Sequence, residues 1–271
     1  MAMPVAAPAE PEMVTTSKQA HWQANLAVAP RAVGSFYASS IATFKAMFRR
    51  PFHMREFLEQ AWFIASVSIM PALLMAIPFC MMFVYQINIL LAEIGAVDLS
   101  GAGAGVAIIR EIGPVVTVLV VAGAGSTAIC ADLGSRTIRE EIDAMKVLGI
   151  DPIQRLCVPR VLASIVIAVF LNGLVSAVGL VGGYIATVYM QGASPGQYIT
   201  SSSILTGISD FVISELKAAV FGMLAGLVAC HLGLGVRGGP KGVGDAVNQT
   251  VVFSFLLLFL ANSVITTIAL H

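Results

Sequence analysis

Five stretches of the chain are apolar for about 20 residues or more, which is the length a helix needs to cross the hydrocarbon core of a bilayer. This feature excludes most folds open to a sequence of 271 residues. The stretches cover residues 61–91, 106 or 111 to 132, 156–190, 211–234 and 247–270. Only 11% of all residues are charged, against about 25% in soluble domains. We therefore expect an all-α integral membrane protein with five transmembrane helices.

The first 60 residues differ in character from the rest. Residues 1–30 are rich in proline and alanine and have no apolar run long enough for a signal peptide, so we expect a tail that is disordered or is ordered by a partner. Residues 33–60 mix aromatic side chains with lysine and arginine, which is typical of helices lying in the membrane interface. A soluble helix packed on the remaining protein is the alternative. Residues 31–271 are expected to form one membrane domain.

The densest cluster of charge lies between the second and third apolar stretches, at residues 137–149. Thr137 and Glu140 have the spacing of a capping box, which marks a helix start, and Gly149 suits the position just past a helix end. An apolar stripe at helical spacing consists of Ile138, Ile142, Met145 and Leu148. The other face carries charges spaced for ion pairs, Arg139 with Asp143 and Asp143 with Lys146. We therefore expect a short amphipathic helix suited to contact with another protein.

Lysine and arginine residues predict the orientation in the membrane. They cluster before the first span, between the second and third spans, and between the fourth and fifth, whereas the other two connections contain none. All three clusters face the cytoplasm if the N-terminus is cytoplasmic and the C-terminus is periplasmic. Arg110 and Lys217 depart from this pattern, and each has an acidic neighbour in the sequence, Glu111 and Glu215.

No pattern typical of a catalytic, metal-binding or nucleic-acid-binding protein is present. The four cysteines lack CxxC spacing, and the sequence has no HExxH and nothing resembling a Ser/His/Asp set. Residues 233–238 match GxGxxG, but no strand precedes them, so a turn is expected there. The formal net charge of zero gives no reason to expect nucleic acid as a partner. We therefore expect a chain that is not an enzyme and binds no cofactor or metal.

The energy for transport would then come from an ion gradient or from a partner protein. A transporter or channel driven by an ion gradient, without an ATPase, would need ionisable residues near the bilayer midplane, and the chain has few candidates. The amphipathic charged helix favours a partner.

Four central segments are distinctive: REIGPVVTVLVVAGAGS (residues 110–126), ADLG (131–134), EEIDAMKVLGIDP (140–152) and PRVL (159–162). Together they resemble the MlaE/YrbE permease family, and the resemblance extends over all five spans in order. Residues 122–130 and the Trp62-Phe63 pair are most similar to the A-type YrbE subunit of Mce systems, which occur in mycobacteria and related actinobacteria.

This resemblance implies a permease subunit of an ATP-driven ABC-type transporter in the inner (plasma) membrane. The expected cargo is a lipid such as a fatty acid, a mycolic acid or a sterol, and the expected direction is import. Three partners are implied: a second YrbE-type permease in a heterodimer, a cytoplasmic ATPase dimer that holds ATP and Mg²⁺, and an assembly of MCE proteins on the outer face.

The resemblance also implies two sites. Residues 137–149 would be the coupling helix, whose apolar residues Ile138, Ile142 and Met145 pack on the permease. Its contacts with the ATPase would come from Arg139, Glu140, Glu141, Asp143 and Lys146. A solvated loop helix is the alternative.

A lipid headgroup would lie near Arg110 and Glu111 at the outer start of the second span, although an ion pair that anchors the helix end explains this pair equally well. Tyr85, Gln86 and Asn88 give the first span a polar edge at similar depth and are expected to line the same cavity; anchoring at the membrane interface is the alternative for these three.

Overall fold

The computed structural model describes residues 33–49, 53–190 and 192–269. The described residues fall into two compact units, one ending at Ala42 and the other beginning at Thr43. The tail predicted at residues 1–30 lies outside the described residues. Residues 33–47 are helical, whereas residues 54–60, also predicted to form interfacial helix, are the first turns of a long helix that continues into the first span.

The second unit contains five helical segments that are long and apolar enough to cross a membrane. They are α2 (Met54–Glu93), the composite segments Val97–Ile138 and Ile153–Tyr189, α9 (Ile208–Leu234) and α10 (Gly239–Ala269). No strand occurs among the described residues. The prediction of an all-α integral membrane protein with five transmembrane helices is confirmed.

The second and third spans are built from shorter helices joined by π-helical turns. The second consists of a 3₁₀ turn (Val97–Leu99), α3 (Ser100–Val106), a π turn (Ala107–Ile112), α4 (Gly113–Val120), a π turn (Val121–Gly125) and α5 (Ser126–Ile138). The third consists of a π turn (Ile153–Cys157), α7 (Val158–Ile185) and a π turn (Ala186–Met190). Because π-helical turns are frequently found at functional sites, the turn that contains Arg110 and Glu111 is of particular interest.

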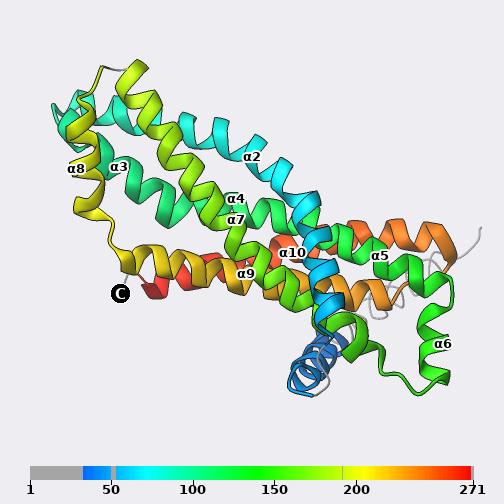
Figure 1. The fold of residues 1–271 in the computed structure, drawn as a ribbon. Helices are drawn as coiled ribbons and strands as arrows, with labels where there is room; N and C mark the ends of the chain where they lie inside the picture. The colour runs from blue at the N-terminus through cyan, green and yellow to red at the C-terminus, as the bar shows by residue number, and fades with distance from the viewer. Residues whose placement is uncertain (1–32, 50–52, 191, 270–271) are drawn as a thin grey trace, which may run out of the picture. The chain divides into compact units, whose positions relative to one another are not determined.

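Two short helices connect the spans. Helix α6 (Glu141–Val147) lies between α5 and the third span, and α8 (Pro195–Leu205) lies between the third span and α9. Figure 1 shows α6 and α8 at opposite ends of the second unit. We call these the α6 end and the α8 end.

Helix α7 packs along both α2 and α9, and glycine makes the second of these contacts possible. A Cβ atom at Gly222 or Gly226 of α9 would collide with Ser164 of α7. The hydroxyl of Ser164 donates a hydrogen bond to the carbonyl oxygen of Gly222 (2.6 Å). The small residues four apart in α9 therefore bring the two helix backbones together, as is common between transmembrane helices.

Candidate functional site

The charged segment at residues 137–149 begins with a sharp turn. Helix α5 continues past Thr137, whose hydroxyl donates to the carbonyl oxygens of Leu133 (2.9 Å) and Gly233 (3.1 Å). Glu140 has a φ of 60°, in the left-handed region that non-glycine residues seldom adopt. The predicted capping box of Thr137 and Glu140 is therefore wrong, because a left-handed residue separates α5 from α6 and the segment is not one helix.

The end of α6 agrees with the prediction. Gly149 has a φ of 75°, and its N–H donates to the carbonyl oxygen of Lys146 (3.0 Å). The N–H of Ile150 donates to the carbonyl oxygen of Met145 (2.9 Å). These two hydrogen bonds form a Schellman motif, which favours glycine because it needs positive φ.

The polar face of α6 carries two exposed ion pairs. Lys146 Nζ lies 2.7 Å from Asp143 Oδ1, as expected. Arg139 Nε lies 3.2 Å from Glu141 Oε1 and not near Asp143, because the turn at Glu140 removes Arg139 from the helical register. Exposed pairs of this kind add less than about 1 kcal/mol to stability, so the charges are available for contact with another protein.

The apolar residues of α6 point in two directions. Ile142 is buried, whereas Val147 and Leu148 at the end of the helix are 88% and 75% exposed. Leu148 belongs to the predicted stripe but does not pack with it, because the helix ends at Val147. Val147 does not belong to the predicted stripe. The two adjacent apolar side chains at the tip of a charged helix form the exposed surface that we call the α6 tip.

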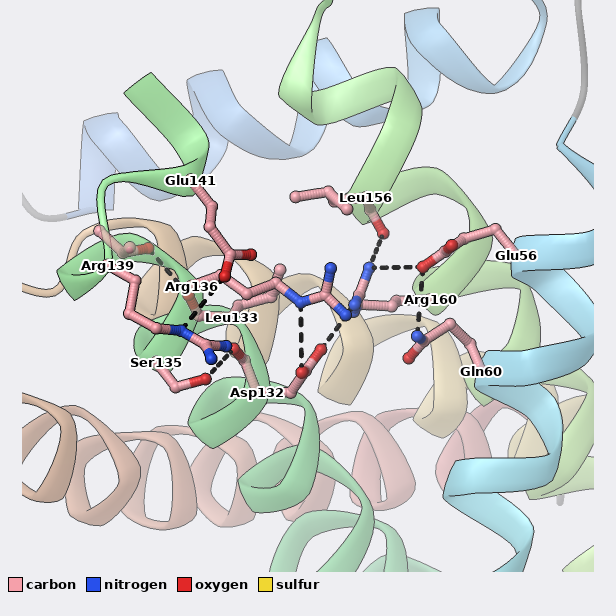
Figure 2. A network of polar contacts seen from close by, with 11 residues as sticks. Glu56, Gln60, Asp132, Leu133, Ser135, Arg136, Arg139, Glu141, Leu156 and Arg160 are labelled. Carbon is pink, nitrogen blue, oxygen red and sulfur yellow. Dashed lines mark hydrogen bonds and ion pairs between the residues drawn. The ribbon is translucent and has the colours of Figure 1, made fainter. Parts of the chain in front are cut away.

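A network of ion pairs joins three helices beside α6 (Figure 2). Arg160, in the first turn of α7, has no exposed side-chain surface. Its Nη2 lies 2.6 Å from Asp132 Oδ2 of α5, and its Nη1 lies 3.5 Å from Glu56 Oε1 of α2. Nη1 also donates to the carbonyl oxygen of Leu156 (2.9 Å). Arg136 Nε pairs with the same Asp132 side chain at 3.3 Å.

The sequence patterns did not predict this network: Arg160 entered only the orientation argument and the PRVL segment of the family resemblance. The available signal was Asp132, because a carboxylate at the end of an apolar span needs a partner. Its pairing with Arg160 depends on how α5 and α7 pack, and the sequence does not display that.

At the α8 end, charged side chains surround a small cavity of about 80 Å³. The cavity is lined by Arg110, Glu111, Asp210, Ile213, Ser214, Lys217 and Thr266. Arg110 Nε lies 3.0 Å from Asp210 Oδ1. The structure thus brings the predicted residues Arg110 and Glu111 together with Asp210 and Lys217, which the site prediction did not include. Within the described residues, no group of three His, Cys, Asp or Glu side chains is placed to hold a metal ion.

Lys217 is nearly buried in this cavity wall. Its Nζ donates to Thr266 Oγ1 (2.9 Å) and to the carbonyl oxygen of Arg110 in the π turn (3.3 Å), and Glu111 lines the same cavity. Glu215, the expected acidic neighbour, does not pair with Lys217. Residues two apart in a helix point to different sides, so nearness in sequence does not produce an ion pair here.

The three predicted residues of α2 lie elsewhere. Tyr85 and Gln86 are exposed, whereas Asn88 is buried and its Nδ2 donates to Thr187 Oγ1 (2.8 Å). None of the three lines the cavity around Arg110 and Glu111. This cavity contains no residue of α2, because the π turn, α9 and α10 form its wall, so the predicted shared cavity is not found here. A lipid contact of these side chains on another surface stays a prediction.

Comparison with known proteins extends these observations. The family model described as Permease MlaE matches residues 57–268, which include α6 and the cavity. A probable ABC transporter permease protein of Synechocystis sp. is 31% identical over 232 residues, covering 86% of this chain and 88% of that protein. One of Rickettsia conorii is 31% identical over 237 residues, covering 87% and 91%. The Arabidopsis thaliana protein trigalactosyldiacylglycerol 1, chloroplastic, is 34% identical over 158 residues, covering 58% and 45%.

Proposed function

Because this chain belongs to the MlaE permease family of ABC transporters, we propose that it is the membrane-spanning subunit of a lipid transporter driven by a partner ATPase. ABC transporter permeases are transmembrane subunits, and ATP hydrolysis lies on a separate chain. The observation that carries the proposal is the α6 tip, where Val147 and Leu148 are exposed beside two ion pairs.

The α6 tip has the composition of a protein contact. Apolar side chains that become buried on binding supply affinity, and the surrounding charges supply specificity and steer association. Ile142 packs inward and the α5–α6 turn is tight, so α6 can transmit the movement of a bound ATPase to the spans. We assign ATPase contacts to Arg139, Glu140, Glu141, Asp143 and Lys146 in addition to Val147 and Leu148.

The cavity at the α8 end supports the lipid part of the proposal. Arg110 and Lys217 line a small space at the end of the spans together with Glu111 and Asp210. Its two cations suit the polar group of a lipid whose chains remain in the bilayer. The name of the Arabidopsis thaliana relative refers to a glycerolipid, which agrees with lipid as the cargo.

We place the chain further among the A-type YrbE subunits of an actinobacterial Mce system, on the resemblance of residues 122–130. A second YrbE-type permease would complete a heterodimer, and MCE proteins would continue the path on the outer face. The distribution of lysine and arginine favours an inner-membrane protein with a cytoplasmic N-terminus and a periplasmic C-terminus. Import of fatty acids, mycolic acids or sterols is the activity proposed.

Substitution of the α6 tip tests ATPase docking directly. In the double variant Val147→Ser/Leu148→Ser, we expect at least about tenfold less ATPase to copurify, because each buried apolar side chain contributes about 1.5–3 kcal/mol. Ala144→Ser on the same exposed helix is the control and is expected to bind normally. Charge reversal at Glu140 and Glu141 is expected to abolish lipid-dependent ATP hydrolysis without loss of expression. Normal copurification in the double variant would contradict the proposal.

A transporter driven by an ion gradient is the second candidate, and one feature favours it. Both carboxylate oxygens of Glu215 are buried, and within the described residues the side-chain amide of Asn172 is the one group that interacts with them. The same amide donates to Ser214 Oγ (2.9 Å). Transport that persists after deletion of the ATPase and is lost in Glu215→Gln would favour this candidate.

A further inference from the structure

We infer that Arg160 is a positioning residue that ties both arms of α6 to the base of α2, so that α6 and α2 move together. The two arms are the last turns of α5 before α6 and the π turn Ile153–Cys157 after it. The inference rests on the proposed docking of an ATPase at α6, and it gives a role to a residue outside the proposed docking surface.

The burial of Arg160 requires an explanation beyond stability. A charge without water contact is costly, and ion pairs in the interior compensate for that cost without adding much net stability. Arg160 has no exposed side-chain surface, and its two acidic partners belong to two other helices. Buried ion pairs can instead specify one arrangement of the elements they join, and here they join α7, α5 and α2.

The first arm is connected through Asp132. This carboxylate pairs with Arg160 at 2.6 Å and with Arg136 at 3.3 Å. Arg136 lies in the last turn of α5, directly before the turn that leads into α6. Figure 2 shows this series of contacts continuing beside the Arg139–Glu141 pair at the start of α6. A displacement of α6 therefore reaches Arg160 through α5.

The second arm and α2 converge on the same guanidinium group. Nη1 of Arg160 donates to the carbonyl oxygen of Leu156, within the π turn that follows α6 (2.9 Å). The same Nη1 lies 3.5 Å from Glu56 in the first turn of α2, and Gln60 donates to Glu56 (3.3 Å). Because α2 runs along α7 toward the α8 end, movement at its base can reach the opposite end of the bundle.

The experiment measures whether α6 and the base of α2 stay together during ATP turnover. Spin labels are placed at Ala144→Cys on α6 and Leu58→Cys on α2, which are exposed, whereas the native cysteines are buried. Distances are recorded in the complete transporter with its ATPase, without nucleotide and after trapping with ATP and vanadate. We expect a narrow distribution, unchanged by trapping, with native Arg160. We expect Arg160→Lys to broaden or shift it on trapping, because an ammonium cannot hold both carboxylates in the geometry of a guanidinium.

Arg55→Lys is the matched control, since Arg55 forms an exposed ion pair with Glu59 in the same first turns of α2. If Arg160→Lys does not assemble, Glu56→Gln replaces it, because that change releases α2 and leaves the Arg160–Asp132 pair intact. If Arg160 only stabilised the fold, Arg160→Lys would lower the yield of the complex but would not change the distance between the two spin labels in the complexes that assemble. Distances in Arg160→Lys or Glu56→Gln that match the native complex would overturn the inference. Failure of the native complex to bind an ATPase would instead overturn the proposed function.

Discussion

The ion-pair network at the α6 end and the cavity at the α8 end each contain two basic and two acidic side chains, but the two sites are built differently. At the α6 end, Arg160 is fully buried and contacts carboxylates from two helices. At the α8 end, Arg110 is 38% exposed, pairs with Asp210 and lines a cavity of about 80 Å³. The central arginine of the first arrangement is enclosed by protein, whereas that of the second remains accessible.

This difference suits the two ends to different tasks, transmission of movement and binding of a ligand. An ion-pair network around a buried cation holds elements in one arrangement, because loss of its carboxylate partners leaves that cation without compensation. An accessible pair is weak and can exchange partners with a ligand. The α6 end is therefore suited to transmitting movement, and the α8 end is suited to binding a polar group.

The largest effect is expected from Arg160→Met, which leaves Asp132 and Glu56 without their buried cation. The free energy of unfolding should fall by about 3–5 kcal/mol, measured by denaturant or thermal unfolding of the purified protein in lipid nanodiscs. Arg55→Met, in the exposed pair, is expected to cause no measurable change. If Arg160→Met and Arg55→Met had the same free energy of unfolding, the buried network would contribute no more to stability than an exposed ion pair.

A smaller effect is expected from Lys217→Met at the α8 end. The carbonyl oxygen of Arg110 and the hydroxyl of Thr266 lose their donor, which should cost about 1–3 kcal/mol of unfolding free energy. The same change removes a cation from the cavity, so native mass spectrometry should detect less bound anionic lipid. Leu216→Met, on an exposed face of the same helix, is the control. If Lys217→Met lowered the free energy of unfolding as much as Arg160→Met does, the two ends would not differ in how strongly their charges stabilise the fold.

The smallest effect on stability is expected from Asp210→Asn, which weakens a partly exposed ion pair and should change the unfolding free energy by less than about 1 kcal/mol. The amide oxygen can still accept the hydrogen bond from the Gly207 N–H. Because Arg110 loses its competing carboxylate, anionic lipid should bind more tightly, measured by titration into the purified protein. Unchanged lipid affinity would show that Arg110 does not face the ligand.

Local features of the sequence predicted local features of the structure well. The five spans follow from apolar length alone, and Gly149 ends α6 because the Schellman motif needs only residues near it in the chain. The start of α6 was predicted wrongly, although Thr137 and Glu140 have the required spacing. Thr137 instead contacts Gly233 of α9 and stays in α5, and no local pattern contains that contact.

The sequence by itself determined the class of the protein, its five spans, its charged connecting helix and its resemblance to a permease family, because each of these depends on composition or on residues close together in the chain. Only the tertiary structure determined which polar and charged side chains contact one another. Lys217 contacts Thr266 and the carbonyl oxygen of Arg110 and not Glu215. Asn88 contacts Thr187 and does not line the cavity. Arg160 lies buried against carboxylates of α2 and α5. The physical reason is that an ion pair between helices depends on their relative rotation and depth, which packing along the whole length of the helices determines.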